Sequence, residues 1–265
     1  MTSSPAAHSD RPRALVTGAS AGLGREYARQ LARDGYDLVL AARSEPALRR
    51  AAQEIEAEHR VTVDVRAVDL STQEGIDALI EVIDSTRVDV LVNNAGFGLK
   101  ASLLDSDPER LIATDMVMLR AVTLLSRAAA RRMRERGRGG ILTVSSLAVL
   151  GSYGTYSAVK SAALLVTEAL ASELADTPVT VTAVLPGFVT TEFHDRMGVR
   201  RAGPGWLWLD ADRVVSESLA DARRGHVVSV PSLRYKALHA VAHAVPRALV
   251  RRASGGLGLK RRARH

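Results

Sequence analysis

The chain has 265 residues, 46% of them hydrophobic and 25% charged, and its mean hydropathy is +0.01. These values are typical of a chain that buries one large core, so we expect a single domain. Because there is no cysteine, disulfides, thiolate catalysis and cysteine-ligated metals are excluded, and no metal site is predicted. Residues 1–13 lack the apolar stretch of a secretory signal, and residues 237–250 are too short to cross a bilayer, so we expect a cytoplasmic protein.

The net charge of +7 belongs to the C-terminus. Nine of the 36 Lys and Arg residues lie beyond Pro231, whereas no Asp or Glu lies beyond Asp221. The first 231 residues therefore carry 27 basic and 29 acidic groups. Since the basic tract lacks interleaved aromatic residues, we do not predict nucleic-acid binding.

Short apolar runs alternate with helical patterns through most of the chain. Strands are predicted at residues 14–17, 37–42, 61–68, 88–93, 141–145, 179–185 and 226–230, and helices at 24–34, 45–59, 72–86, 108–136, 156–176 and 210–224. Apolar strands that alternate with helices form a parallel sheet covered on both faces. We predict a single-domain, doubly wound, Rossmann-like α/β fold over residues 12–231, with a flexible N-terminus at 1–11 and a basic extension at 232–265.

Three glycines, Gly18, Gly22 and Gly24, lie between the first predicted strand and the first predicted helix. Glycine at such points lets the backbone approach a pyrophosphate, which then lies on the N-terminus of the helix. The sequence therefore predicts a dinucleotide site at this turn.

A phenol and an ammonium group, Tyr156 and Lys160, are four residues apart, which places them on one face of a predicted helix. A free tyrosine is a weak acid–base at neutral pH, and a nearby ammonium favours its phenolate form. Together with a nucleotide site, this pair points to hydride transfer at a carbonyl carbon.

These motifs, with Asn93-Asn94-Ala95-Gly96 and Pro186-Gly187, resemble the short-chain dehydrogenase/reductase family over about residues 12–231. The resemblance implies an oxidoreductase in which Tyr156 is the acid–base, Lys160 tunes it and holds the nicotinamide ribose, and Ser146 stabilises the substrate oxygen; Ser145 is the alternative. It also implies a set of cofactor-binding residues: Gly18, Ser20, Ala21, Gly22, Leu23, Gly24, Asp69, Leu70, Asn94, Ala95, Gly96, Tyr156, Lys160, Pro186, Gly187, Val189 and Thr191.

Cofactor choice is predicted from the end of the second strand. NAD sites usually hold an acidic residue there, which binds the ribose 2′-hydroxyl. This chain has Ala42 followed by Arg43, whose guanidinium suits a 2′-phosphate. We therefore predict that NADP(H) is preferred over NAD(H).

Two features depart from the family pattern. Ser146 precedes Tyr156 by only ten residues, so the connecting loop is short. Met118 stands where the family usually has an asparagine that supports a water in the proton relay to the lysine. A thioether cannot hold that water, so we expect a relay through other waters or through Asp115.

Residues 192–209 occupy the place of the family's substrate lid, and their apolar content favours an apolar ketone or alcohol, such as a 3-oxoacyl or steroid-like compound. Packing of the lid on the body, or an oligomer contact, is the other interpretation. The apolar residues are Phe193, Met197, Trp206, Leu207, Trp208 and Leu209.

The extension combines apolar and basic residues, and we expect it either to lie on an anionic membrane surface or to pack on a neighbouring subunit. The resemblance implies a homodimer or homotetramer. Two rival functions remain at this point: a catalytically weak NADP(H)-binding sensor or scaffold, and a membrane-surface assembly protein.

Overall fold

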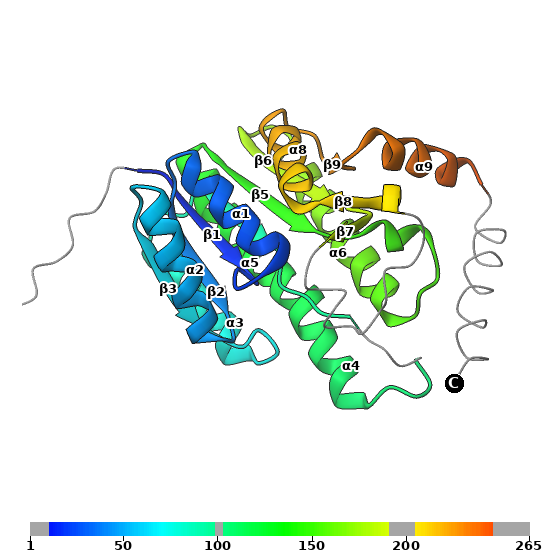
Figure 1. Cartoon of the computed structure of the whole chain (residues 1–265), viewed down its shortest axis with the longest axis horizontal. Helices are drawn as coiled ribbons and strands as arrows, with labels where there is room; N and C mark the ends of the chain where they lie inside the picture. Colours follow the sequence, from blue (N-terminus) through cyan, green and yellow to red (C-terminus); the bar gives the residue numbers. More distant parts are fainter. Residues whose placement is uncertain (1–10, 99–102, 191–204, 246–265) are drawn as a thin grey trace, which may run out of the picture.

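The protein is described by a computed structural model that covers residues 11–98, 103–190 and 205–245. Its centre is a parallel sheet of seven strands in the order β3-β2-β1-β4-β5-β6-β9 (Figure 1). The strands in that order are β3 (Val63–Ala67), β2 (Asp37–Ala42), β1 (Arg13–Thr17), β4 (Val90–Asn93), β5 (Gly139–Val144), β6 (Val179–Val184) and β9 (Val228–Ser229). The strand order reverses at β1, so the predicted doubly wound fold is confirmed.

Helices cover both faces of the sheet (Figure 1). One face packs against α1 (Gly22–Arg33), α2 (Glu45–Glu58) and α8 (Ala211–Arg223), and the other against α3 (Gln73–Ser85), α5 (Ala121–Arg136) and α6 (Thr155–Glu173). Central strands bury side chains on both faces; Leu15 and Val16 belong to opposite cores. This two-sided burial explains why the strands are continuous apolar runs.

The helix predicted at 108–136 has a different hydrogen-bond pattern at its middle. It comprises α4 (Pro108–Asp115), a π-helical turn η1 (Met116–Arg120) and α5. Ala121 N–H donates to the carbonyl of Met116, five residues earlier. Turns of this kind are rare and concentrate at functional sites.

Five further elements lie in segments that were predicted as loops, lid or extension. Four of them precede the extension. They are the 3-10 turns η2 (Leu147–Leu150) and η3 (Gly205–Leu207), and a two-stranded parallel sheet of β7 (Phe188–Thr190) and β8 (Trp208–Asp210). A helix, α9 (Leu233–Ala244), follows β9. Its Tyr235 belongs to a core cluster with Leu185, Val189 and Leu209, so the beginning of the predicted extension is part of the body.

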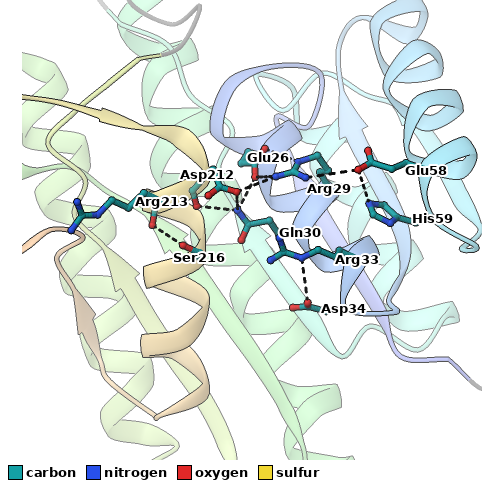
Figure 2. Close-up of polar contacts among 10 residues, drawn as sticks. All are labelled: Glu26, Arg29, Gln30, Arg33, Asp34, Glu58, His59, Asp212, Arg213 and Ser216. Carbon is teal, nitrogen blue, oxygen red and sulfur yellow. Dashed lines mark hydrogen bonds and ion pairs between the residues drawn. The ribbon is translucent and has the colours of Figure 1, made fainter. Parts of the chain in front are cut away.

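A polar cluster joins α1 to the beginning of α8 (Figure 2). Gln30, which is only 1% exposed, donates from Nε2 to the Glu26 carboxylate (2.7 Å) and to the carbonyl oxygen of Asp212 (3.0 Å). The Arg29 guanidinium bridges the carboxylates of Glu26 (2.7 Å) and Asp212 (3.1 Å). The cluster thus fixes the helix that follows the glycine turn against the helix that follows β8.

Most of the predicted flexible N-terminus, residues 192–204 of the predicted lid and residues 246–265 of the extension lie outside the described residues. The membrane and subunit interpretations of the extension therefore stay predictions. Within the described segments, no helix combines the length and the apolarity needed to span a membrane.

Candidate active site

The glycine turn connects β1 to α1 at the carboxyl edge of the sheet. Gly18 and Gly22 have φ angles of +66° and +57°, a region that favours glycine. At Gly24 the requirement is space, because a Cβ atom there would lie 2.3 Å from the Gly18 oxygen and 2.4 Å from Asn94 Nδ2. The N-cap residue, Ala21, makes no side-chain capping bond to α1. The first amides of the helix are thus available to an anion, and the turn fits the predicted pyrophosphate.

Asn94 fixes this turn from β4. Its Nδ2 donates to the carbonyl oxygens of Thr17 (3.0 Å) and Gly18 (3.3 Å). The Thr17 hydroxyl accepts from the backbone N–H groups of Asn94 (3.0 Å) and Ala95 (3.1 Å). Asn93 donates to Ser126 of α5 (2.8 Å). The Asn-Asn-Ala-Gly segment therefore joins the turn, the central sheet and the long helix.

The predicted adenosine-side residues follow β2 and β3, next to this turn. Arg43 is exposed and, among the described residues, forms no ion pair or hydrogen bond. The Asp69 carboxylate accepts from the N–H (2.9 Å) and hydroxyl (2.8 Å) of Ser71, and Leu70 is buried. The guanidinium of Arg43 is thus available to a ligand, whereas Asp69 is held within its own loop.

Tyr156 and Lys160 lie one turn apart near the start of α6, and Nζ of Lys160 is 5.9 Å from the centroid of the Tyr156 ring. Lys160 is 5% exposed and donates to the carbonyl oxygen of Val144, at the end of β5 (2.7 Å). Burial lowers the pKa of Lys160 to about 8. The ammonium is therefore buried on the carboxyl edge of the sheet, beside the phenol.

The pKa of Tyr156 differs from the expectation that the Lys160 ammonium lowers it. Burial raises the pKa of Tyr156 to about 12, and a hydrogen bond with the Ser146 side chain acts in the opposite direction. Lys160 is not among the causes of this shift, and its ammonium donates to the carbonyl oxygen of Val144. The role of Lys160 in lowering the pKa of Tyr156 stays a prediction.

The two serines at the end of β5, Ser145 and Ser146, have different hydrogen-bond partners. Ser145 is buried, and its hydroxyl donates to the carbonyl oxygen of Lys160 (2.8 Å), which ties β5 to α6. Ser146 hydrogen-bonds to Tyr156 and accepts from Ala148 N–H (3.1 Å). The geometry thus favours Ser146 for substrate and gives Ser145 a structural role, despite the short loop.

The position of the expected relay asparagine lies in the π-helical turn. Met118 is 1% exposed, and a Cβ atom on Gly96 would lie 3.1 Å from its sulfur and 3.6 Å from Lys160 Nζ. Asp115 is exposed to solvent. The structure therefore places a thioether near Lys160, whereas Asp115 lies at an exposed position of α4. The expected help from Asp115 stays a prediction.

The Pro186-Gly187 segment leads from β6 into β7, where Val189 is buried. Thr191 lies outside the described residues. The rings of Phe188 and Trp208 pack with centroids 5.3 Å apart, which supports packing on the body for this tryptophan. Trp206 remains 59% exposed.

Sequence reasoning missed Tyr235, whose ring lies against Gly187. A Cβ atom at Gly187 would lie 2.1 Å from Tyr235 Cζ. The tyrosine is 47 residues from Phe188, to which it hydrogen-bonds, and the only signal was an aromatic residue in an otherwise aliphatic and basic tail.

The profile of the short chain dehydrogenase family matches residues 12–201. The chain belongs to the short-chain dehydrogenase/reductase family. This is a family of oxidoreductases, and the expectation drawn from the motifs is confirmed.

Individual relatives agree with this assignment. The chain is 31% identical over 236 residues to the Mycobacterium tuberculosis protein named "Probable oxidoreductase EphD", covering 87% of this chain but only 38% of that protein. The NADPH complex of a short-chain dehydrogenase from Sphingobium yanoikuyae has a TM-score of 0.80 and 29% identity, covering 88% of this chain and 94% of the other.

Two further solved structures bear on ligands. A bulky-bulky ketone specific alcohol dehydrogenase from Comamonas testosteroni has a TM-score of 0.76 and 28% identity, covering 89% of this chain and 94% of the other. A family member from Burkholderia phymatum, in complex with NAD, has a TM-score of 0.76 and 25% identity, covering 88% and 92%. Similar structures thus hold both nicotinamide cofactors.

Proposed function

We propose that the chain transfers a hydride between NADP(H) and the alcohol/carbonyl pair of an apolar substrate, with Tyr156 as the acid–base. The main support is the meeting of Ser146, Tyr156 and Lys160 at the sheet edge that carries the glycine turn. Ligands of doubly wound sheets bind at this edge. Membership of an oxidoreductase family supports the same reaction.

Each side chain has one task in the reduction direction. The nicotinamide, when bound, supplies the hydride with its electron pair to the carbonyl carbon. The Tyr156 hydroxyl gives its proton to the carbonyl oxygen, which becomes the alcohol. The Ser146 hydroxyl donates a hydrogen bond to the same oxygen while charge develops there. The Lys160 ammonium stabilises the phenolate that remains.

The preference for NADP(H) rests on Arg43. The Arg43 guanidinium follows β2 and has no protein partner among the described residues. It can therefore bind a 2′-phosphate through two parallel hydrogen bonds. NADPH in the Sphingobium enzyme is in keeping with this preference.

The matched test compares Arg43→Ala with Arg50→Ala, which removes an exposed arginine of α2. We expect Arg43→Ala to raise the KM for NADPH by about tenfold or more, because losing a charge-assisted hydrogen bond weakens binding by about that factor. The KM for NADH should stay unchanged. Arg50→Ala should change neither. An unchanged KM for NADPH in Arg43→Ala would rule out the assigned phosphate contact.

The proposed substrate class is an apolar ketone or alcohol, such as a 3-oxoacyl, steroid-like or other hydrophobic compound. The exposed ring of Trp206 and the other apolar side chains within residues 192–209 support it. The similar Comamonas enzyme, which is described as specific for bulky-bulky ketones, points in the same direction.

Met118 favours a second candidate, an NADP(H)-binding sensor with little turnover, because its thioether beside Lys160 is a poor carrier of protons. Tight NADPH binding without oxidation of NADPH by any ketone would favour the sensor. Turnover that depends on Tyr156 would exclude it.

A further inference from the structure

The hydroxyl of Tyr235 joins two strands that are distant in sequence. It accepts from the backbone N–H of Phe188, the first residue of β7 (3.2 Å), and donates to the carbonyl oxygen of Leu207, directly before β8 (2.6 Å). β7 and β8 pair in parallel from Phe188 and Trp208 onward. One phenol thus fixes the point at which this small sheet begins.

The ring of Tyr235 fixes the segment before β7. The side chain is 5% exposed, and its ring fills the space that a Cβ atom on Gly187 would need. Gly187 lies between Pro186 and Phe188, so the ring limits how the Pro186–Phe188 backbone can lie. Tyr235 belongs to the same core cluster as Leu185 and Val189, which lie on either side of this segment.

The start of α9 is itself held in place, so Tyr235 has a defined position. Ser232 has a φ angle of +81°, which L-residues rarely adopt, and its N–H donates to the Glu217 carboxylate of α8 (2.7 Å). Arg234 donates from Nη1 to the carbonyl oxygen of Trp206 (2.7 Å). Contacts to α8 and η3 thus hold the residues directly before Tyr235 in place.

We propose that Tyr235 is a positioning residue that holds the Pro186–Val189 segment against the nicotinamide half of the cofactor. The proposal rests on the proposed function, which places this segment at the nicotinamide. It assigns a role in cofactor binding to α9, which lies beyond the 12–201 range that the family profile matches.

The test uses Tyr235→Phe, which keeps the ring against Gly187 and removes both hydrogen bonds. Two ligands are titrated by calorimetry: NADPH, and 2′-phospho-ADP-ribose, which lacks the nicotinamide. We expect the Kd for NADPH to rise by about tenfold, the effect of losing two hydrogen bonds that order the segment, and the Kd for 2′-phospho-ADP-ribose to stay unchanged.

Tyr27→Phe is the matched control. The Tyr27 hydroxyl is buried and hydrogen-bonds to Ser218 (2.6 Å), so this variant also loses a buried tyrosine hydrogen bond, but between α1 and α8. It should lower the thermal stability and leave the ratio of the two Kd values at its wild-type level. A second variant, Gly187→Ala, should displace the ring and weaken NADPH binding selectively, as Tyr235→Phe does.

Two results would overturn the proposal: equal weakening of both ligands in Tyr235→Phe, which indicates a general structural role, or no change in either. Failure of the wild-type protein to bind NADPH is a separate result. It would reject the proposed function first, and the positioning role with it.

Discussion

The charge of Lys160 is the residue-scale property on which the proposed chemistry depends most. Its Nζ has one hydrogen-bond acceptor among the described residues, the Val144 carbonyl oxygen, and lies 5.9 Å from the centroid of the Tyr156 ring. Because burial lowers its pKa to about 8, Lys160 is charged at neutral pH and loses its charge in mildly alkaline solution.

We predict that kcat/KM for ketone reduction is constant near neutral pH and falls as the pH rises through about 8. Below this pKa the ammonium supports the phenolate of Tyr156, and above it that support is lost. The measurement is the pH profile of NADPH oxidation. Lys160→Met is the control: it should be slow and should lack the alkaline limb of the profile, which is the decline in rate at high pH. A wild-type profile that is flat to pH 10 would refute the assignment.

A second prediction concerns Met118. In Met118→Asn an amide replaces the thioether beside Lys160, so it can hold water and hydrate the ammonium. Hydration favours the charged form, and the alkaline limb should move to higher pH. Asp115→Ala removes an exposed carboxylate of the same helix and tests the other relay route, because a limb that moves in this variant would assign the relay to Asp115. If Met118→Asn alters neither turnover nor the limb, the thioether does not control the proton supply.

At the scale of elements, the turn between β1 and α1 depends on space as well as on backbone conformation. We predict that Gly24→Ala abolishes tight NADPH binding, because its Cβ atom would overlap the Gly18 carbonyl and displace Asn94. Gly205→Ala, where a Cβ atom meets no atom of the described residues within 4 Å, is the control and should bind NADPH normally. Normal binding by folded Gly24→Ala, measured by titration, would contradict the assigned pyrophosphate site.

Elements with a strong periodic pattern were predictable from the sequence. The strand at 37–42 and the helices on both sides of it have the expected ends to within two residues, because apolar runs and glycine turns delimit them. The π-helical turn was not predictable, since Met116–Arg120 fit an α-helical pattern equally well. The neighbour of its Met118, Gly96, is distant in the sequence.

Short elements with distant partners were also missed. β7 and β8 have three residues each and become strands only by pairing with each other across residues 191–207. Tyr235 hydrogen-bonds at the start of both strands, and its partners lie more than 25 residues away in the sequence. Local pattern carries no information on such contacts.

At the scale of the whole molecule, the sheet brings the predicted site together. The glycine turn, Asn94 and Ser146 follow β1, β4 and β5, which are neighbours in the sheet, and α6 adds Tyr156 and Lys160. The order of the motifs along the chain was enough to predict that these residues lie close together, because parallel strands end at the same edge of the sheet. The orientation of Lys160 toward Val144 was not predictable, since it depends on side-chain packing. The expected dimer or tetramer stays a prediction.

The most direct test of the account is NADPH oxidation by the wild type and by Tyr156→Phe, measured by absorbance with a panel of apolar ketones and 3-oxoacyl esters. Tyr156→Phe keeps the ring and removes the acid, so we predict turnover by the wild type and a loss of at least about a hundredfold in the variant, with NADPH still bound. Turnover retained by Tyr156→Phe, or tight NADPH binding by a wild type that reduces no ketone of the panel, would contradict the account.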